Sequence, residues 1–294
     1  MMKILLLGSG GQVGQELQRT LTRHGELVCL SRQELDLTQL DRVAEVVGLL
    51  QPQVVINAAA YTAVDKAETE PELAHSINGV APGLLAEAAQ QVSAAVIHLS
   101  TDYVFNGTKN TPYEETDTTD PLGSYGHSKR AGEVAVLQAN DRAIVLRTAW
   151  VYGAAPSAKN FVKTMLRVGP ERGLVKVVMD QVGAPTWAYD IAAAISDLVA
   201  PVQAGQGGLY HFASSGVASW FDVAIATFEE AQTLGLIEAL PEVVPIPTSE
   251  YPLPAQRPAY SVFSCQKISQ LLGRRPPYWR QSLRKMLAEL AAQT

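Results

Sequence analysis

Apolar residues in the first half of the chain recur in two spacings that predict alternating strands and helices. Short apolar runs, typical of buried strands, lie at residues 3–7, 26–30, 54–57, 96–100 and 143–147. Segments with apolar residues at helical spacing lie between them, most clearly at 16–21, 40–50 and 71–91. Strands that alternate with helices in this way predict an α/β fold with a doubly wound parallel sheet.

The pattern loosens after residue 150. We expect shorter elements between residues 152 and 182, then a helix at 189–199 and a strand at 209–212. Two further helices are expected at 220–234 and 278–292. Residues 241–258 include six prolines, which lack the amide hydrogen that ladders and helices use. We therefore expect no regular structure in that segment.

A glycine-rich turn follows the first predicted strand and leads into the first predicted helix. Its glycines at 8, 11 and 14 have the spacing G-x-x-G-x-x-G, and Gly10 adds a looser variant. Glycines let a pyrophosphate approach the backbone, and the amides at the helix start point toward it. The context favours a dinucleotide site over a glycine-rich turn without a ligand, with cofactor contacts expected from Gly8, Gly10, Gly11, Gln12, Val13 and Gly14.

The end of the second predicted strand bears on which dinucleotide is bound. In an NAD site an acidic residue at this position binds the ribose diol. Here no acidic residue follows Leu30 before Glu34 and Asp36, whereas Arg32 suits a 2′-phosphate. The pattern favours NADPH, with an ordinary loop arginine as the alternative. After the third predicted strand, small side chains allow a cofactor to approach closely at Ala58, Ala59 and Ala60.

The size of the chain, 294 residues and 31.6 kDa, allows one large domain or two modest ones. We expect residues 1–150, completed by about 187–212, to form a Rossmann-type dinucleotide-binding domain. Residues 151–186 and 213–294 are expected to form a smaller C-terminal substrate-binding lobe. A content of 47% hydrophobic and 18% charged residues is typical of a soluble globular protein.

Charge, cysteines and histidines argue against several kinds of function. A net charge of -6 and a pI of about 5.4 give no electrostatic support for nucleic-acid binding. The apolar run near the N-terminus is too short for a signal sequence or a membrane span. Cys29 and Cys265 are far apart, which fits a reduced, cytoplasmic protein in which Cys29 is buried core. The five histidines form no close pair, so we expect no zinc site.

A phenol and an ammonium stand four residues apart, at Tyr125 and Lys129. The segment follows Pro121 and is expected to be helical, with Ser124 as its cap, so both side chains would share one face. A nearby ammonium favours the phenolate, which lowers the phenol pKa and makes proton transfer useful at neutral pH. By itself, this spacing is more often that of an exposed pair on a helix surface.

Three motifs together resemble the extended short-chain dehydrogenase/reductase family. They are the glycines at 8, 11 and 14, Thr101 at a strand end, and Tyr125-x-x-x-Lys129, in the right order on the right elements. Further segments resemble the dTDP-4-dehydrorhamnose reductase branch of that family, at residues 57–68, 100–105, 147–152, 180–186 and 257–258. The resemblance runs from residue 3 to about residue 290.

This resemblance implies reduction of the C4 keto group of dTDP-4-dehydro-L-rhamnose by NADPH or NADH, which gives dTDP-L-rhamnose. It implies that Tyr125 protonates the developing alkoxide, that Lys129 lowers the tyrosine pKa and holds the nicotinamide ribose, and that Thr101 donates to the same oxygen. The other positions that match the family lie near the adenine (Asp36, Leu37), along the cofactor (Ala58 to Ala60), against the nucleotide sugar (Asp102, Tyr103, Trp150, Arg257) and in support of the site (Asn78).

Some members of this family bind magnesium at a dimer interface through acidic residues. Glu16 and Glu289 match two such positions, but the third position is Tyr189. A hard cation that lacks one carboxylate is held weakly or not at all. We therefore expect no metal, and either a monomer or a homodimer.

Two other functions on the same fold stay open. A nucleotide-sugar epimerase or dehydratase would retain NAD and return the hydride to its substrate. Tyr103 follows Asp102, where the common dehydratase arrangement has a glutamate, and this argues against a dehydratase. A non-catalytic subunit, like the regulatory partner of methionine adenosyltransferase, would be favoured by loss of the tyrosine–lysine pair, but both residues are present.

Overall fold

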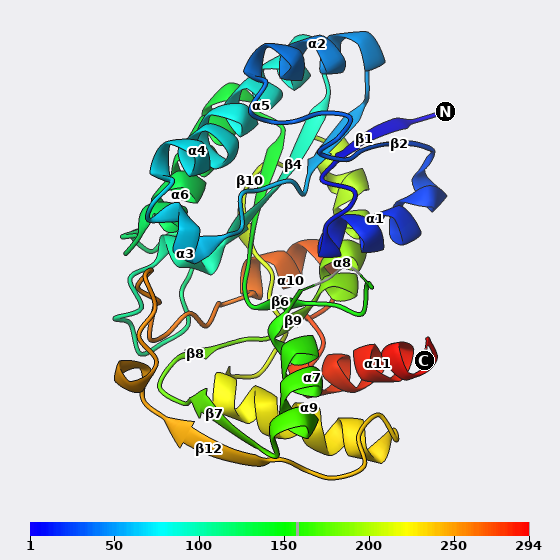
Figure 1. The fold of residues 1–294 in the computed structure, drawn as a ribbon. Coiled ribbons are helices and arrows are strands. Elements are labelled where there is room, and N and C mark those ends of the chain that lie inside the picture. The colour runs from blue at the N-terminus through cyan, green and yellow to red at the C-terminus, as the bar shows by residue number, and fades with distance from the viewer. Residues whose placement is uncertain (157–158, 294) are drawn as a thin grey trace.

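The protein is built around a six-stranded, fully parallel sheet (Figure 1). The computed structural model describes residues 1–156 and 159–293. The strand order is β10-β5-β4-β3-β1-β2. The strands are β1 (Lys3–Leu7), β2 (Glu26–Leu30), β3 (Val54–Asn57), β4 (Ala95–Thr101), β5 (Ala143–Thr148) and β10 (Gly208–His211). The predicted doubly wound parallel sheet is confirmed.

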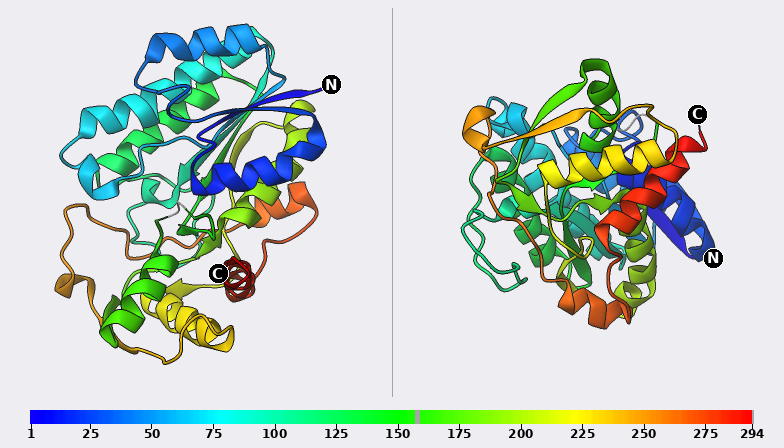
Figure 2. Two further views of the ribbon diagram at one scale, coloured as in Figure 1. Left: turned by 45° about the vertical axis from the view of Figure 1, so that its right-hand side comes forward. Right: turned by 90° about the horizontal axis from the view of Figure 1, so that it is seen from below.

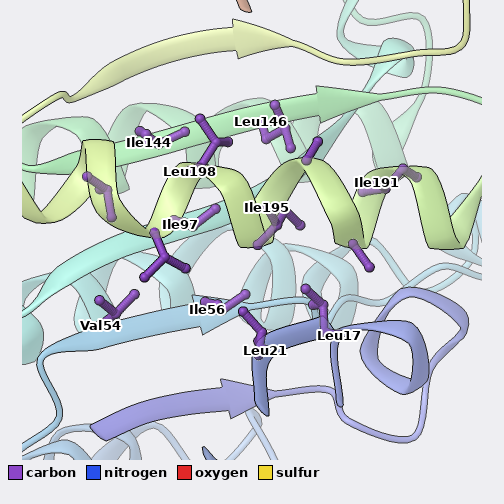
Figure 3. Packing of buried hydrophobic residues seen from close by; sticks show 14 of the residues in the cluster. Leu17, Leu21, Val54, Ile56, Ile97, Ile144, Leu146, Ile191, Ile195 and Leu198 are labelled. Carbon is purple, nitrogen blue, oxygen red and sulfur yellow. The ribbon is translucent and has the colours of Figure 1, made fainter. Parts of the chain in front are cut away.

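Helices cover both faces of this sheet. Side chains of successive strand residues point to opposite faces, and on the central strands both sets are apolar. On β1, Ile4 and Leu6 pack with α1 (Gln12–Leu21), α8 (Ala188–Gln203) and α10 (Gln266–Leu272). Leu5 and Leu7 face the other way, toward α2 (Leu40–Leu50), α5 (Ala81–Gln91) and α6 (Ser124–Ala139). Figure 3 shows α8 lying across the strands, with its isoleucines and Leu198 over the strand side chains. Two apolar clusters, one on each face, thus fix the sheet between helices.

The order of strands reverses beside β1, since β2 lies on one side of it and β3 on the other. In open parallel sheets, ligands bind in the crevice that such a reversal leaves at the carboxyl ends of the strands. The turns after β1 and β3 are the glycine-rich turn and Ala58 to Ala60. The topology therefore brings the predicted cofactor residues to one edge.

The long helix predicted at 71–91 is present, with a wide turn in its middle. It runs as α4 (Pro71–His75), the π-helical segment η2 (Ser76–Val80) and α5. Such π turns insert an extra residue and often occur at functional sites. Asn78 lies in this segment and is buried.

Below the sheet, as seen in Figures 1 and 2, lies a smaller group of elements from the second half of the chain. Three helices, α7 (Phe161–Arg172), α9 (Trp220–Thr233) and α11 (Trp279–Ala291), share an apolar core there. The short elements are α3 (Val64–Ala67), η1 (Thr22–His24), η3 (Asp102–Val104), η4 (Thr248–Glu250), and the strand pairs β6 (Val151–Tyr152) with β9 (Thr186–Trp187) and β8 (Val182–Gly183) with β11 (Ala218–Ser219). Within residues 1–156 and 159–293, no helix is long and apolar enough to span a bilayer.

Three expectations about local structure were wrong. The proline-rich segment contains a strand, β12 (Glu242–Ile246), which pairs in parallel with β7 (Leu174–Val178). Pro245 can lie there because a strand with one partner directs every second amide away from the ladder. The stretch expected to hold only short elements contains the twelve-residue helix α7. Cys29 is only partly buried, because β2 is the edge strand of its sheet.

An ion pair is buried between the sheet and α6. Arg147 on β5 donates through Nε and Nη2 to the two carboxylate oxygens of Glu133, each at 2.7 Å. The Ser100 hydroxyl donates to Glu133 at 2.7 Å, and Arg147 Nη1 lies 3.3 Å from His211 Nε2 on β10. Arg147 and Glu133 are 1% and 0% exposed, so either charge alone would be strongly disfavoured.

We expect the Arg147→Met variant to lose about 3 kcal/mol of unfolding free energy, because it removes the bidentate partner of the buried Glu133 carboxylate and leaves only Ser100 and the longer contact of 3.3 Å with Arg130. The double variant Arg147→Met/Glu133→Leu should recover most of this loss. Urea denaturation of the three proteins measures both effects. Equal losses in the single and double variants would contradict the assignment of the cost to the unpaired charge.

Candidate active site

A cavity of 590 Å³ opens at the carboxyl edge of the sheet, where the strand order reverses. Of the residues predicted to bind the cofactor, all but Gly14 line it: Gly8, Gly10, Gly11, Gln12, Val13, Arg32, Asp36, Leu37, Ala58, Ala59, Ala60, Tyr125 and Lys129. A larger cavity of 910 Å³ lies between the segment after β10 and α10, and none of the predicted site residues lines it. The chemistry therefore lies in the smaller cavity.

The glycines of the turn have different tasks. Gly8 has a φ of 75°, and a Cβ on it would lie 2.5 Å from the Ala59 amide nitrogen. A Cβ on Gly14 would lie 2.1 Å from the Gly8 carbonyl oxygen, so Gly14 lets α1 pack on the turn rather than line the cavity. Gly10 has open space around it, with no atom within 4 Å of a built Cβ. The open backbone and the cavity volume fit a dinucleotide.

The opposite end of the cavity carries a charged pair. Arg32 Nε lies 3.2 Å from Asp36, and the arginine side chain is 78% exposed. Asp36 also accepts bonds of 2.9 Å from the amide and the hydroxyl of Thr38, and its carboxyl pKa is lowered chiefly by the amide bond. Arg32 is thus placed at the mouth of the cavity with most of its guanidinium accessible.

Helix α6 begins at Ser124, but not with Ser124 as its cap. Gly123 is the capping position, and Glu68 accepts bonds from the Ser124 amide at 2.8 Å and its hydroxyl at 3.3 Å. A carboxylate from another segment therefore satisfies the helix start. In the first turn, a Cβ on Gly126 would lie 2.3 Å from the Tyr103 carbonyl oxygen, so the helix contacts the end of β4 closely.

Tyr125 and Lys129 lie one turn apart on α6, as predicted, and burial is the main cause of the pKa shift of each. The Lys129 ammonium donates to the Leu99 carbonyl at 2.6 Å. Burial raises the Tyr125 pKa to about 12, against the effect of the neighbouring Thr101 hydroxyl. Burial also lowers the Lys129 pKa to about 8, against the charge of Glu133. Burial outweighs pairing at both groups, so Tyr125 carries its proton at neutral pH.

The residues after β4 form a compact group beside Tyr125. The Thr101 hydroxyl donates to Asp102 at 3.1 Å and accepts the Tyr103 amide at 3.2 Å. The Tyr103 ring stands edge-on to Tyr125, with centroids 5.4 Å apart and planes at 80°. The structure therefore brings Thr101, Asp102, Tyr103 and Tyr125 together.

Of the residues predicted for substrate binding, Tyr125 lines the 590 Å³ cavity, whereas Thr101, Asp102, Tyr103, Trp150 and Arg257 do not. Trp150 stacks on Trp220 with ring centroids 3.6 Å apart. Arg257 forms an ion pair with Asp65 at 3.0 Å. The first contact joins the end of β5 to α9 and the second joins the proline-rich segment to α3, and the sequence predicted neither contact.

Two asparagines hold the loops of the site: Asn78, which the family resemblance gave as a supporting residue, and Asn57, which sequence reasoning missed. The Asn57 side chain accepts the Ala59 amide at 3.0 Å, and Asn78 binds the backbone of Tyr61 at 2.8 and 3.0 Å. Asn78 also donates to Ser128 on α6 at 3.0 Å. For Asn57, the one available signal was a polar residue in an otherwise apolar strand, which an exposed side chain would equally explain.

The positions that match a magnesium site do come together, but around an arginine. Arg19 lies 2.9 Å from Glu16 and 2.7 Å from Glu289, and its guanidinium is 5.6 Å from the centre of the Tyr189 ring. The Arg19 guanidinium already occupies the space between the two carboxylates and the third position is a tyrosine, so these residues do not fit a magnesium ion. In the described part of the chain, no three His, Cys, Asp or Glu residues form a group that could hold a metal.

We expect the Asp102→Asn variant to be more stable than the parent protein at neutral pH. Burial raises the Asp102 pKa to about 6, above about 3.9 in the unfolded chain. The folded state then binds more protons between pH 4 and 6, so this carboxyl favours folding at low pH and that contribution is lost as the pH rises through 6. The gain should reach about 3 kcal/mol at pH 7.5 and vanish near pH 4 in urea denaturation.

Asp117 offers a control with the opposite sign, because its hydrogen bond with Lys109 lowers its pKa. Asp117→Asn should reduce stability at neutral pH. If Asp102→Asn is less stable than the parent at both pH values, its hydrogen bonds outweigh the cost of burying the carboxylate.

Comparison with known proteins places the chain among nucleotide-sugar enzymes. The family model for the RmlD substrate binding domain matches residues 2–292. The dTDP-4-dehydrorhamnose reductase of Burkholderia thailandensis is 43% identical to this chain, over 99% of this chain and 100% of its own length. The Escherichia coli K12 enzyme is also 43% identical, over 100% of this chain and 99% of its own length.

Solved structures agree with these relatives. A dTDP-4-dehydrorhamnose reductase from Clostridium acetobutylicum has a TM-score of 0.90 at 38% identity, over 98% of this chain and 99% of that one. The Bacillus anthracis enzyme in complex with NADP has a TM-score of 0.90 at 35% identity, over 98% and 100%. A Thermus thermophilus UDP-glucose 4-epimerase, at 22% identity, shares the fold. The resemblance predicted from the motifs is confirmed, and the chain belongs to the family of dTDP-4-dehydrorhamnose reductases.

Proposed function

We propose that this protein reduces the C4 keto group of dTDP-4-dehydro-L-rhamnose, with NADPH or NADH, to give dTDP-L-rhamnose. The observation that carries the proposal is the placement of Tyr125 and Lys129 in the wall of the glycine-turn cavity, with Thr101 beside the tyrosine. The names of the relatives that match the whole chain supply the substrate. The NADP complex of the Bacillus anthracis enzyme supports the cofactor.

The cofactor would be held by three groups of residues. The backbone around Gly10 and Gly11 would receive the pyrophosphate, Ala58 to Ala60 would lie along the dinucleotide, and Arg32, Asp36 and Leu37 would border the adenosine end. When bound, the nicotinamide cofactor supplies the hydride that reduces the ketone. The protein has to place the carbonyl and supply one proton.

Tyr125 would give that proton to the ketone oxygen. A phenol with a pKa near 12 is protonated before the reaction and resists losing its proton until negative charge develops on the substrate. Lys129, whose pKa of about 8 keeps it largely charged at neutral pH, would stabilise the phenolate that remains. The Thr101 hydroxyl, which donates to Asp102 in the structure, would turn from Asp102 to donate a second bond to the same oxygen, at the point where charge develops.

The nucleotide sugar would extend from this point toward the second half of the chain. Asp102 and Tyr103 would contact the sugar, Trp150 would contact the base, and Arg257 would lie on the nucleotide-sugar side in its pair with Asp65. We assign cofactor binding to residues 1–150 with about 187–212, and substrate binding to 151–186 with 213–294. We also propose that the enzyme is cytoplasmic, because its two cysteines are free thiols, as is usual in a reducing compartment. We propose either a monomer or a homodimer.

NADPH oxidation against a panel of nucleotide-linked 4-keto sugars tests the reaction, and Tyr125→Phe tests the proton donor. The variant should keep its fold and cofactor affinity while kcat falls by about 10²–10⁴, the usual effect of losing a general acid. Tyr278→Phe, at a tyrosine that is 45% exposed and outside the cavity lining, is the control and should behave like the parent. No turnover of any 4-keto sugar by the parent would contradict the function, and normal turnover by Tyr125→Phe would contradict the residue assignment.

The cofactor preference is tested at Arg32. If its guanidinium binds the 2′-phosphate, Arg32→Ala should raise KM for NADPH by about tenfold and leave NADH almost unchanged. Arg42→Ala removes an exposed arginine from α2, outside the cavity, and serves as the control. Equal changes for both cofactors would show that Arg32 is an ordinary loop residue.

A further inference from the structure

A proline-rich segment of the second half of the chain is fastened to the first half by a single acidic residue. We name residues 251–258 the clasp segment; it follows η4 and rises toward α3 in Figure 1. Asp65 on α3 accepts the Ala255 amide at 3.2 Å. It also accepts from Arg257 Nη1 at 3.1 Å and Nη2 at 3.0 Å, one to each carboxylate oxygen. Three bonds from one carboxylate thus hold two residues of the segment.

These bonds leave Arg257 little capacity for a ligand. A guanidinium has five N–H donors. Nη1 uses both of its donors, on Asp65 and on the Ala255 carbonyl at 2.8 Å, and Nη2 uses one on Asp65. The Asp65 charge also offsets the Arg257 charge where a diphosphate would approach. Arg257 therefore forms a bidentate pair with Asp65 and is not free to bind a phosphate.

Arg257 also reaches the candidate catalytic group through Tyr103. Burial raises the Tyr103 pKa, and the guanidinium charge of Arg257 acts against that rise, so the two groups are close. The Tyr103 ring in turn stands edge-on to Tyr125 at 5.4 Å. Its carbonyl oxygen is the atom that α6 approaches at Gly126. A contiguous set of contacts therefore runs from Asp65 through Arg257 and Tyr103 to Tyr125.

We propose that Asp65 is a positioning residue, which holds Arg257 and the clasp segment so that Tyr103 is fixed against Tyr125 when the nucleotide sugar binds. The proposal rests on the proposed function for its effect on turnover. The pair is partly exposed, with 19% of the Arg257 side chain and 38% of the Asp65 side chain accessible. Pairs of this kind add little to global stability, so the effect is expected in placement.

The Asp65→Asn variant separates this role from direct phosphate binding by Arg257. With the clasp weakened, kcat should fall and KM for the nucleotide sugar should rise, each by up to about tenfold, while the dissociation constant for NADPH stays unchanged. If Arg257 serves only as a phosphate ligand, Asp65→Asn frees its guanidinium, and KM should fall or stay the same. That second result would overturn the proposal. Asp41→Asn, at an exposed aspartate on α2, is the matched control.

A charge exchange sharpens the test, because Arg257→Ala harms both roles alike. Asp65→Arg/Arg257→Asp restores an ion pair between α3 and the clasp segment, and it should recover kcat relative to Arg257→Ala. Under the phosphate-ligand role the exchange puts a carboxylate where the diphosphate binds, so the exchanged protein should be worse than Arg257→Ala. A result of that kind would contradict the clasp.

A readout without substrate keeps this proposal separable from the proposed function. The Ala255 amide donates to Asp65, so its hydrogen exchange should accelerate at least tenfold in Asp65→Ala, which removes the acceptor, and remain unchanged in Asp41→Ala. Unchanged exchange would overturn the clasp whatever the enzyme reduces. Failure of the parent to reduce any 4-keto nucleotide sugar, with faster exchange in the variant, would overturn the proposed function and leave the clasp standing.

Discussion

The candidate site depends on how closely helix α6 approaches the end of β4. A Cβ on Gly126 would lie 2.3 Å from the Tyr103 carbonyl oxygen, and one on Gly132 would lie 2.0 Å from the Asn78 carbonyl oxygen. Any larger residue at either position would push the helix away from the sheet or from the π turn, because both obstacles are backbone atoms. Two glycines therefore set the distance at which Tyr125 and Lys129 stand from the strand end that carries Thr101.

At that distance, burial governs the protonation of the two groups. A site that excludes water disfavours charge on either one, which raises the pKa of the Tyr125 phenol and lowers that of the Lys129 ammonium. The tyrosine therefore holds its proton until an acceptor arrives, which suits an acid better than a base. The pKa values of Tyr125 and Lys129 are thus set mainly by burial.

Ion pairs between arginine and carboxylate connect elements that lie far apart along the chain. Glu133 and Arg147 join α6 to the sheet, Arg19 joins α1 to α11 through Glu289, and Arg257 joins the clasp segment to Asp65 on α3. The first pair is buried and costly to break, whereas the other two are partly exposed and act mainly on placement. Arginine–carboxylate pairs thus stabilise the packing of α6 on the sheet in one case, and position surface elements relative to one another in the other two.

Local periodicity was sufficient for the central sheet. The ranges 3–7, 26–30, 40–50 and 54–57 match β1, β2, α2 and β3, because the direction of an apolar side chain repeats along the chain itself. The glycine turn and the tyrosine–lysine spacing were likewise readable, since each is a local requirement. The strand around Pro245, the hydrogen bond of Asn78 with Ser128 and the pairing of Asp65 with Arg257, 192 residues later, were not. Each of these depends on a partner that the topology brings from elsewhere, and no periodicity in the sequence records which partner a polar group or an edge strand will meet.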